Sequence, residues 1–280
     1  MTTILTEKQK IEILDAVRNA GRGLLSAHDI ESHMKVKPGD ANFATVWDVE
    51  TQKALCSRLH EIVPEADFLA EEDTDGGDAD TASAYDERGN AGSTAVTFIV
   101  DPIDGTTNFI HGLSHSAVSV AVSSCGEPVF GCVYNPYLDE MFYASSGTGA
   151  FMSKGGTVTR LHVSDRALGR ALCAFGTSPY ERSNADLTFD LAKRMFLSCR
   201  EIRREGSAAL DICYVAAGRY DVYFELRICP WDFAAAMLIL TEAGGVMTSL
   251  DGSPIDTRRP TSAFASNIAC RDAASAILSR

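Results

Sequence analysis

The segment with the strongest influence on how this chain folds reads TFIVDPIDGTTNF and runs from Thr97 to Phe109. Its apolar start leads directly into two aspartates, Asp101 and Asp104, and then into a Gly-Thr-Thr turn. Because Pro102 lacks an N–H and is not tolerated inside a helix, the apolar run is predicted to be a strand with both acids at its end. On spacing alone, an Asp-rich turn whose carboxylates accept hydrogen bonds from backbone amides explains the segment equally well.

Helical and strand-like patterns alternate along the rest of the chain. Thr6 and Gln9 have capping-box spacing, and apolar residues follow at helical intervals as far as Leu24. A second helix is predicted from about Asp48 to Ile62. Strands are further predicted at residues 96–100, 117–123, 128–134, 140–144, 201–204 and 220–225, and helices at residues 186–196, 207–217 and 232–243. The pattern indicates a mixed α/β protein of layered sheets and helices, with an exposed loop at residues 73–95.

The chain is acidic, since 38 aspartates and glutamates outweigh 25 lysines and arginines and give a formal net charge of −13. That excess disfavours nucleic acid as the main partner. A protein of this charge needs a local source of positive charge to hold an anionic substrate, and bound metal is one candidate. The eight cysteines include no C-x-x-C pair, so neither a zinc site nor a redox site is indicated.

The amino-terminal segment MTTILTEKQKIEIL lacks the basic start and the unbroken apolar stretch of a signal peptide. The longest apolar segments are much shorter than the roughly 20 residues that a membrane-spanning helix needs. We therefore expect a cytoplasmic protein that does not enter the membrane.

Two further acidic sites accompany the central segment. Glu71 and Glu72 follow an apolar stretch, and Asp232 follows Trp231 at the start of a predicted helix. Taken alone, Glu71 is typical of a solvated loop acid and Asp232 of a helix cap. These interpretations of Glu71 and Asp232 change when the two sites are considered together with the central segment.

In chain order, the three segments AEE, DPIDGTTNF and WDFAAA resemble the signatures G-E-E, D-P-I-D-G-T-T-N-F and W-D-x-A-A-G of the inositol monophosphatase family. Further matches extend over nearly the whole chain. The resemblance implies a layered αβαβα sandwich, formed by a single unit of residues 1–280 with an α+β lobe at about 1–164 and an α/β lobe at about 165–280. Two positions depart from the signatures, because Ala70 and Ala236 stand where the family has glycine.

The resemblance implies Mg²⁺ as the cofactor and two metal positions that share one carboxylate. Glu71, Asp101 and the backbone carbonyl of Ile103 would hold the first ion, and Asp101, Asp104 and Asp232 the second. Glu71 and Thr106 would orient the attacking water, and Asp48 would hold the Thr106 hydroxyl. Hard oxygen ligands of this kind suit Mg²⁺.

The resemblance also implies the substrate contacts. Asp104 and the turn Gly105-Thr106-Thr107, whose free N–H groups begin a helix, would meet the phosphate end of the substrate. Gly206, Ser207 and Ala208 would present backbone groups to the polyol, and Glu225 would accept hydrogen bonds from its hydroxyls. A surface acid at the end of a strand is the alternative interpretation of Glu225.

The implied reaction is the hydrolysis of a phosphate monoester, with an inositol monophosphate as the leading substrate. Fructose 1,6-bisphosphate, histidinol phosphate and adenosine 3′,5′-bisphosphate are alternatives on the same fold. A regulatory binding protein of the transcription machinery is the alternative from another class. The resemblance further implies lithium sensitivity and a homodimer, and it leaves two interpretations of Arg203 and Arg204: dimer-surface charges, which we favour, or a phosphate clamp.

Overall fold

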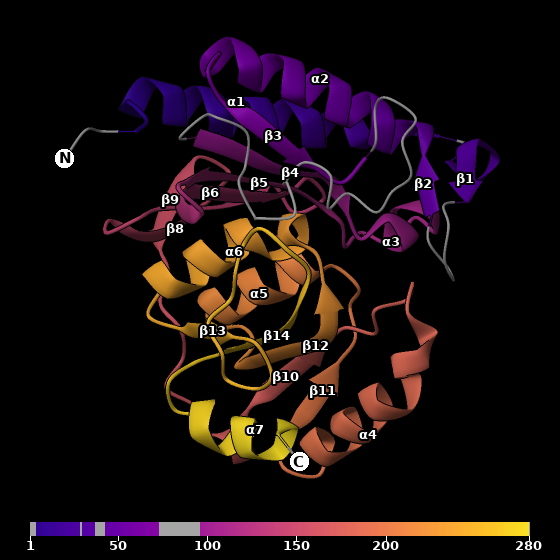
Figure 1. Cartoon of the computed structure of the whole chain (residues 1–280), viewed down its shortest axis with the longest axis vertical. Helices are drawn as coiled ribbons and strands as arrows, with labels where there is room; N and C mark the ends of the chain where they lie inside the picture. Colours follow the sequence, from indigo (N-terminus) through magenta and orange to yellow (C-terminus); the bar gives the residue numbers. More distant parts are fainter. Residues whose placement is uncertain (1–3, 29, 37–42, 73–95, 280) are drawn as a thin grey trace.

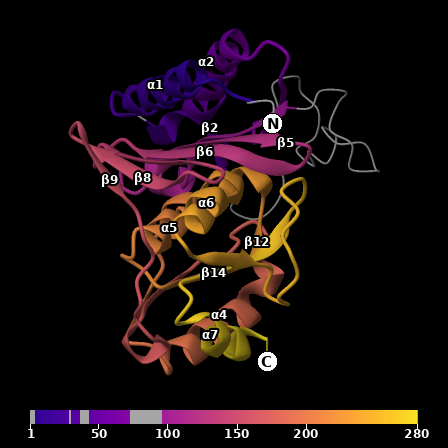
Figure 2. The ribbon, with the colours of Figure 1, turned by 90° about the vertical axis from the view of Figure 1, so that its left-hand side faces the viewer.

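A computed structural model describes residues 4–28, 30–36, 43–72 and 96–279. Its helices and sheets stack in five layers, in the order helix, sheet, helix, sheet, helix (Figure 1, Figure 2). The αβαβα sandwich predicted from the sequence is therefore confirmed. The predicted loop at residues 73–95 lies outside the described residues.

The larger sheet has seven strands in the described part of the chain, in the order β3-β4-β5-β6-β7-β8-β9. These are β3 (Asp67–Ala70), β4 (Val96–Asp104), β5 (Ala117–Ser124), β6 (Glu127–Asn135), β7 (Glu140–Ser145), β8 (Gly149–Lys154) and β9 (Thr157–Arg160). Only β3 and β4 are parallel, and the remaining neighbours are antiparallel. The short β1 (Met34–Val36) and β2 (Phe43–Thr45) form a separate antiparallel pair.

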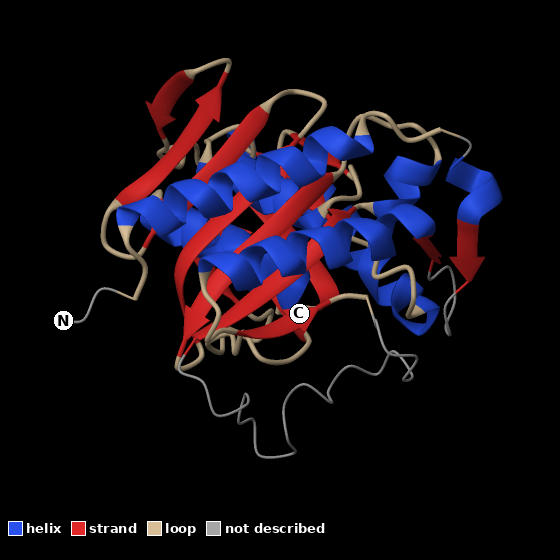
Figure 3. Cartoon of the chain, turned by 90° about the horizontal axis from the view of Figure 1, so that it is seen from above, coloured by secondary structure: helices blue, strands red, loops and turns tan. Residues whose placement is uncertain are grey.

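Two long helices, α1 (Glu7–Leu24) and α2 (Val46–Ile62), lie side by side over one face of the larger sheet (Figure 3). The capping box predicted at the start of α1 is present, with Thr6 and Gln9 bonded reciprocally. The predicted start of α2 was two residues late. Thr45 caps this helix, and the Asp48 carboxylate returns a hydrogen bond to the Thr45 N–H at 2.6 Å, so that Asp48 stands inside the first turn.

The second sheet has five strands among the described residues, in the order β11-β10-β12-β14-β13. They are β10 (Leu172–Phe175), β11 (Glu201–Arg203), β12 (Val222–Ile228), β13 (Val246–Thr248) and β14 (Thr261–Ser266). Helices α5 (Ala208–Ala216) and α6 (Pro230–Glu242) form the layer between the two sheets, and α4 (Ala185–Phe196) and α7 (Arg271–Leu278) cover the outer face (Figure 1).

The central helices are almost entirely buried because both of their faces meet a sheet. Helix α6 carries an apolar run, AAAMLIL, and contributes to the largest core cluster together with residues of both sheets. Its close approach to the larger sheet depends on Gly131 in β6. A Cβ atom at that position would lie 2.8 Å from the carbonyl oxygen of Ala235. There is thus no room for a side chain between β6 and α6, the helix whose first turn carries Asp232.

No helix in the described ranges has both the length and the apolar character needed to cross a membrane.

Candidate active site

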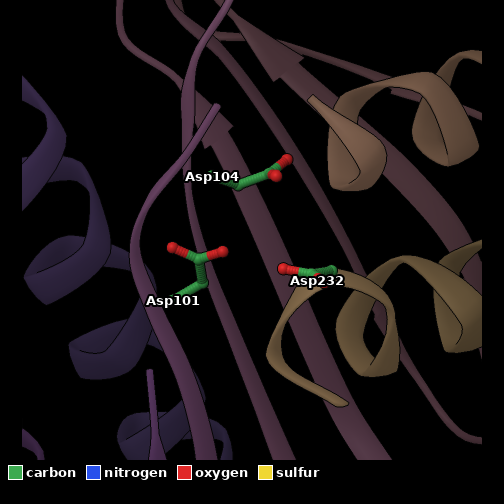
Figure 4. Close-up of side chains that lie close together, drawn as sticks. All are labelled: Asp101, Asp104 and Asp232. Carbon is green, nitrogen blue, oxygen red and sulfur yellow. The ribbon is translucent and has the colours of Figure 1, made fainter. Parts of the chain in front are cut away.

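Three aspartates converge between the larger sheet and the central helices (Figure 4). Asp101 and Asp104 lie on β4, and Asp232 lies in the first turn of α6. One carboxylate oxygen from each falls within 4.8 Å of the other two, and all three residues are less than a tenth exposed. Residues 128 positions apart in the chain therefore form one acidic cluster.

The end of β4 gives the two aspartates their positions. The register with β5 shifts between Asp101 and Asp104, which breaks the alternation of sides expected of a regular strand. The Ile103 N–H donates to Asp101 Oδ1 at 2.9 Å and fixes that carboxylate. Gly105 then takes a left-handed φ of 87° and turns the chain into α3 (Thr106–Ile110). Both acids thus stand at the strand's end, as the sequence predicted.

Neighbouring helices hold the other carboxylates of the cluster. Asp104 Oδ2 accepts hydrogen bonds from the Ser207 hydroxyl and from the Ala209 N–H, the latter at 2.9 Å, at the start of α5. Asp232 accepts from the Cys229 N–H at 2.7 Å, so that it caps α6 as well as facing the cluster. The helix-cap interpretation and the cluster interpretation of Asp232 are both satisfied by one side chain.

The negative charge of this cluster is not balanced by the protein groups around it. Burial raises the pKa of Asp101 well above its ordinary value, and repulsion from Glu71, Asp104 and Asp232 raises it further. Burial likewise raises the pKa of Asp104 to about 6 and that of Asp232 well above the usual range. Several buried carboxylates at this spacing need a cation to remain ionised together. The donor set, hard oxygens only, fits a divalent metal ion.

Asp48 and Thr106 meet beside the cluster. The Thr106 hydroxyl donates toward Asp48 Oδ1 at 3.2 Å and toward the Ile103 carbonyl at 3.0 Å. Asp48 is completely buried, and its second oxygen belongs to the α2 cap. Glu71 lies directly after β3, where its N–H donates to the Val100 carbonyl at 3.1 Å. The predicted metal and water-orienting residues are thus gathered in one place, although their roles remain predictions.

Glu225 is not a surface acid, which removes the alternative drawn from its place near the end of a strand. It is 6% exposed. Its carboxylate accepts hydrogen bonds from the Ser178 N–H at 2.7 Å and from the Tyr223 hydroxyl at 2.5 Å. A Cβ on Gly176 would lie 2.1 Å from this carboxylate, so only glycine leaves room for it.

A pocket opens over these residues and combines nearly all of the predicted site. Its lining includes Glu71, Asp101, Ile103, Asp104, Gly105, Thr106, Thr107, Gly206, Ser207, Ala208, Glu225 and Asp232. Seven further lining residues were not among the predicted site residues: Phe43, Gly176, Pro179, Tyr180, Arg204, Asp211 and Tyr223. For Arg204 a signal existed, because it lies two residues before Gly206 in a predicted substrate-binding turn. The favoured interpretation, a surface charge with Arg203, did not anticipate its place in the pocket.

The fold and this acidic pocket define the class: a layered αβαβα protein with a buried acidic site that can hold metal. The chain belongs to the inositol monophosphatase family, which it matches over residues 5–278. Three comparisons illustrate the relationship. The chain is 36% identical to a Nus factor SuhB of Vibrio cholerae over 85% of this chain and 83% of that protein. It is 34% identical to an inositol-1-monophosphatase of Caulobacter vibrioides over 91% and 94%.

Among solved structures, the chain resembles the extragenic suppressor protein SuhB of Bartonella henselae. The TM-score is 0.83 at 32% identity, and the alignment covers 96% of this chain and 98% of that one. The five-layer architecture is therefore the same over almost the full length of both proteins.

Proposed function

We propose that this protein hydrolyses the phosphate monoester of a small polyol, most directly myo-inositol monophosphate, to the free alcohol and inorganic phosphate with the aid of Mg²⁺. The observation that carries the proposal is the buried cluster of Asp101, Asp104 and Asp232 in a pocket that also contains Glu225. Membership of the inositol monophosphatase family supports the reaction class. The named substrate goes beyond what that membership establishes.

In this proposal Glu71, Asp101 and the Ile103 carbonyl hold one Mg²⁺, and Asp101, Asp104 and Asp232 hold a second. Divalent ions held there would supply the positive charge that polarises the phosphoryl oxygens and stabilises the departing alkoxide. The need of several buried carboxylates for positive charge supports these assignments. It also answers how an acidic protein holds an anionic substrate.

The attacking water is positioned by groups of the chain itself. The single proton of the Thr106 hydroxyl is within hydrogen-bonding reach of Asp48 and of the Ile103 carbonyl. In this proposal the hydroxyl donates its hydrogen bond to Asp48, so its oxygen lone pairs are free to accept a hydrogen bond from the water. Glu71 takes the water proton as the oxygen attacks phosphorus in line with the leaving group. The phosphorus–oxygen bond to the polyol then breaks, and the alcohol leaves after gaining a proton from solvent.

The two ends of the substrate meet different walls of the pocket. Backbone N–H groups of the turn Gly105-Thr106-Thr107 face the phosphate oxygens. Gly206, Ser207 and Ala208 line the side toward the polyol, where the Glu225 carboxylate accepts hydrogen bonds from hydroxyl groups. This carboxylate is already fixed by Ser178 and Tyr223, so it is held ready to receive the substrate.

A phosphate-release assay tests the proposal. The panel contains myo-inositol 1-phosphate, fructose 1,6-bisphosphate, histidinol phosphate and adenosine 3′,5′-bisphosphate, each with Mg²⁺ and with a chelator. We expect Mg²⁺-dependent release that is fastest from the inositol phosphate and that LiCl inhibits more than KCl does. No release from any member of the panel would contradict the proposal, and a clear preference for another member would correct the substrate.

A partner-binding role is the second candidate, because the relative from Vibrio cholerae is named a Nus factor. A protein acting only through partner contacts has no need of a buried, mutually repelling cluster of acids, and this favours catalysis. The proposed dimer is an expectation from the family, and light scattering of the purified protein measures it. The cytoplasmic location is an expectation from the sequence patterns alone.

A further inference from the structure

Arg204 is the one basic side chain among the described residues that line the pocket, where six acids surround the same space. Its guanidinium nevertheless forms no ion pair with any residue that the structure describes. Its one hydrogen bond to those residues runs from Nη2 to the Thr177 hydroxyl oxygen at 2.9 Å. Since arginine has five N–H donors, most of them remain available to a ligand in the pocket.

Arg203, its neighbour in the chain, has a different environment. Arg203 Nη1 donates to the Ile202 carbonyl at 2.8 Å and lies 3.8 Å from the Glu201 carboxylate. Arg203 is also absent from the pocket lining. The two arginines therefore separate into a surface charge that is already paired and a pocket charge that is not.

Arg204 connects two walls of the pocket. A Cβ on Gly206 would lie 2.5 Å from Arg204 Nη1, and a Cβ on Gly105 would lie 3.0 Å from the Gly206 carbonyl oxygen. The guanidinium therefore packs against Gly206, which in turn adjoins the turn assigned to the substrate phosphate. Thr177, which is not itself among the lining residues, follows the neighbouring strand β10 and lies between Gly176, which packs on the Glu225 carboxylate, and Ser178, which donates to it.

We infer that Arg204 and Thr177 bind a second phosphate group on the substrate, so that polyol bisphosphates are preferred over the corresponding monophosphates. This inference rests on the proposed function, since it concerns the alcohol part of the same substrate. Arginine N–H groups match phosphate oxygens, and the Thr177 hydroxyl, which accepts from Arg204, can still donate its own proton. Without such a cation, the surrounding acids would repel a second phosphate.

A purely electrostatic role toward Glu225 predicts a different result. Burial raises the pKa of Glu225, hydrogen bonds from Tyr223 and Ser178 oppose the rise, and the charge of Arg204 opposes it too. If Arg204 only kept Glu225 ionised, its removal would weaken recognition of polyol hydroxyls. Monophosphate and bisphosphate substrates would then lose activity in equal proportion.

The experiment compares fructose 1,6-bisphosphate with fructose 1-phosphate, which lacks the second phosphate. Fructose 1-phosphate can also close a pyranose ring through its free 6-hydroxyl, but this difference is the same for every variant and cancels when their ratios are compared. The kcat/KM ratio of the two substrates is measured for the wild type, Arg204→Gln, Thr177→Val and the control Arg203→Gln. We expect the wild type to favour the bisphosphate. Arg204→Gln should lower the ratio by about 10- to 100-fold, the scale of one charged hydrogen bond, and Thr177→Val by about 3- to 10-fold. Arg203→Gln should leave it unchanged.

Three results would overturn the inference. The wild type could favour the monophosphate, Arg204→Gln could leave the ratio unchanged, or Arg203→Gln could lower it as much as Arg204→Gln does. In each case Mg²⁺-dependent hydrolysis of fructose 1-phosphate or of the inositol phosphate would leave the proposed function standing. Hydrolysis of no phosphate ester at all would instead remove both.

Discussion

The Thr106 hydroxyl lies 3.2 Å from Oδ1 of Asp48, although 58 positions separate these residues in the chain. The other oxygen of Asp48 accepts hydrogen bonds from the Thr45 N–H and hydroxyl, each at 2.6 Å. One buried carboxylate thus both caps α2 and receives the hydroxyl assigned to the attacking water. The amino-terminal cap of α2, on the outer side of the larger sheet, is therefore tied directly to the proposed catalytic group.

The first prediction separates the two roles of Asp48, which caps α2 and accepts a hydrogen bond from Thr106. Thr106→Val removes the hydroxyl but keeps the shape, and we expect kcat to fall by about 10²-fold or more. Thermal stability should change little, because the cap between Asp48 and Thr45 is untouched. Asp48→Asn should lower both stability and kcat. In a double-mutant cycle on kcat, Thr106→Val should cost much less in the Asp48→Asn background; fully additive losses would show that the two residues act independently.

Local signals in the sequence were sufficient for many of the elements of this fold. The capping box at Thr6 and Gln9 and the helical spacing that follows predict α1, and the run into Pro102 predicts how β4 ends. The start of α2 was misplaced because an Asp in the first turn resembles a cap. Only the structure shows Thr45 as the cap residue, with Asp48 bonded back to it.

Local sequence patterns predicted less of the candidate site than of the fold. Resemblance to the family named Glu225, and Tyr223, which donates to it, lies two residues before it on β12. The second donor, Ser178, comes from a loop 47 positions earlier, which no local pattern links to β12. Arg204 was assigned to the surface because charge patterning does not distinguish two adjacent arginines. Its place in the pocket is accompanied by the left-handed backbone at Gly206 and by the hydrogen bond to Thr177, which follows the neighbouring strand β10.

A second prediction concerns the shared carboxylate of the acidic cluster. Asp101→Asn keeps the shape but removes one charge, and we expect a loss of about 10³-fold or more in kcat at saturating Mg²⁺. Since burial and three neighbouring acids raise the pKa of Asp101, its ionised form destabilises the metal-free protein. The Tm measured in chelator should therefore not fall. Asp272→Asn, at an exposed acid on α7, is the control; near-normal turnover of Asp101→Asn would remove Asp101 from the site.

A third prediction tests the contact that seats α6 on the larger sheet. Gly131→Ala would place a methyl group 2.8 Å from the Ala235 carbonyl oxygen and 3.0 Å from its Cα, both of them backbone atoms. We expect unfolding free energy to fall by about 1–3 kcal/mol, with lower activity because α6 carries Asp232. Gly23→Ala in α1, where a Cβ meets nothing within 4 Å, should instead add about 0.4–1 kcal/mol. Chemical denaturation of both variants measures the contrast, and equal effects would contradict it.

A fourth prediction concerns the pH dependence of stability. Burial alone would raise the pKa of Glu140, but Arg219, bound through two hydrogen bonds at 2.6 and 2.8 Å, and Lys154 hold it below its usual range. A lowered pKa in the folded state stabilises the protein above the unfolded value of about 4.3, and this contribution is lost as pH falls through the folded value. Glu140→Gln should thus cost about 1.5–3 kcal/mol at neutral pH and progressively less below about pH 4. A cost that stays constant across urea titrations at these pH values would contradict the ionic origin.

The last prediction concerns Glu225, on which recognition of the polyol depends. Two variants change its carboxylate in different ways. Glu225→Gln removes the charge and replaces one acceptor oxygen by a donor. Gly176→Ala leaves the side chain intact but places a methyl group 2.1 Å from the carboxyl carbon, which must move. Neither change touches the acidic cluster or Thr106.

If Glu225 accepts hydrogen bonds from the polyol, Glu225→Gln should lower kcat/KM for myo-inositol 1-phosphate by about 10- to 150-fold, the cost of one charged hydrogen bond. An aryl phosphate has no ring hydroxyls and should lose far less. Both variants also disturb the hydrogen bonds from Ser178 and Tyr223, but such local damage affects both substrates and cancels in the ratio of the two losses. Because Gly176→Ala moves the Glu225 carboxylate away from its place, we expect it to shift this ratio in the same direction as Glu225→Gln. A ratio near one in both variants would mean that Glu225 supports the pocket wall without contacting the substrate.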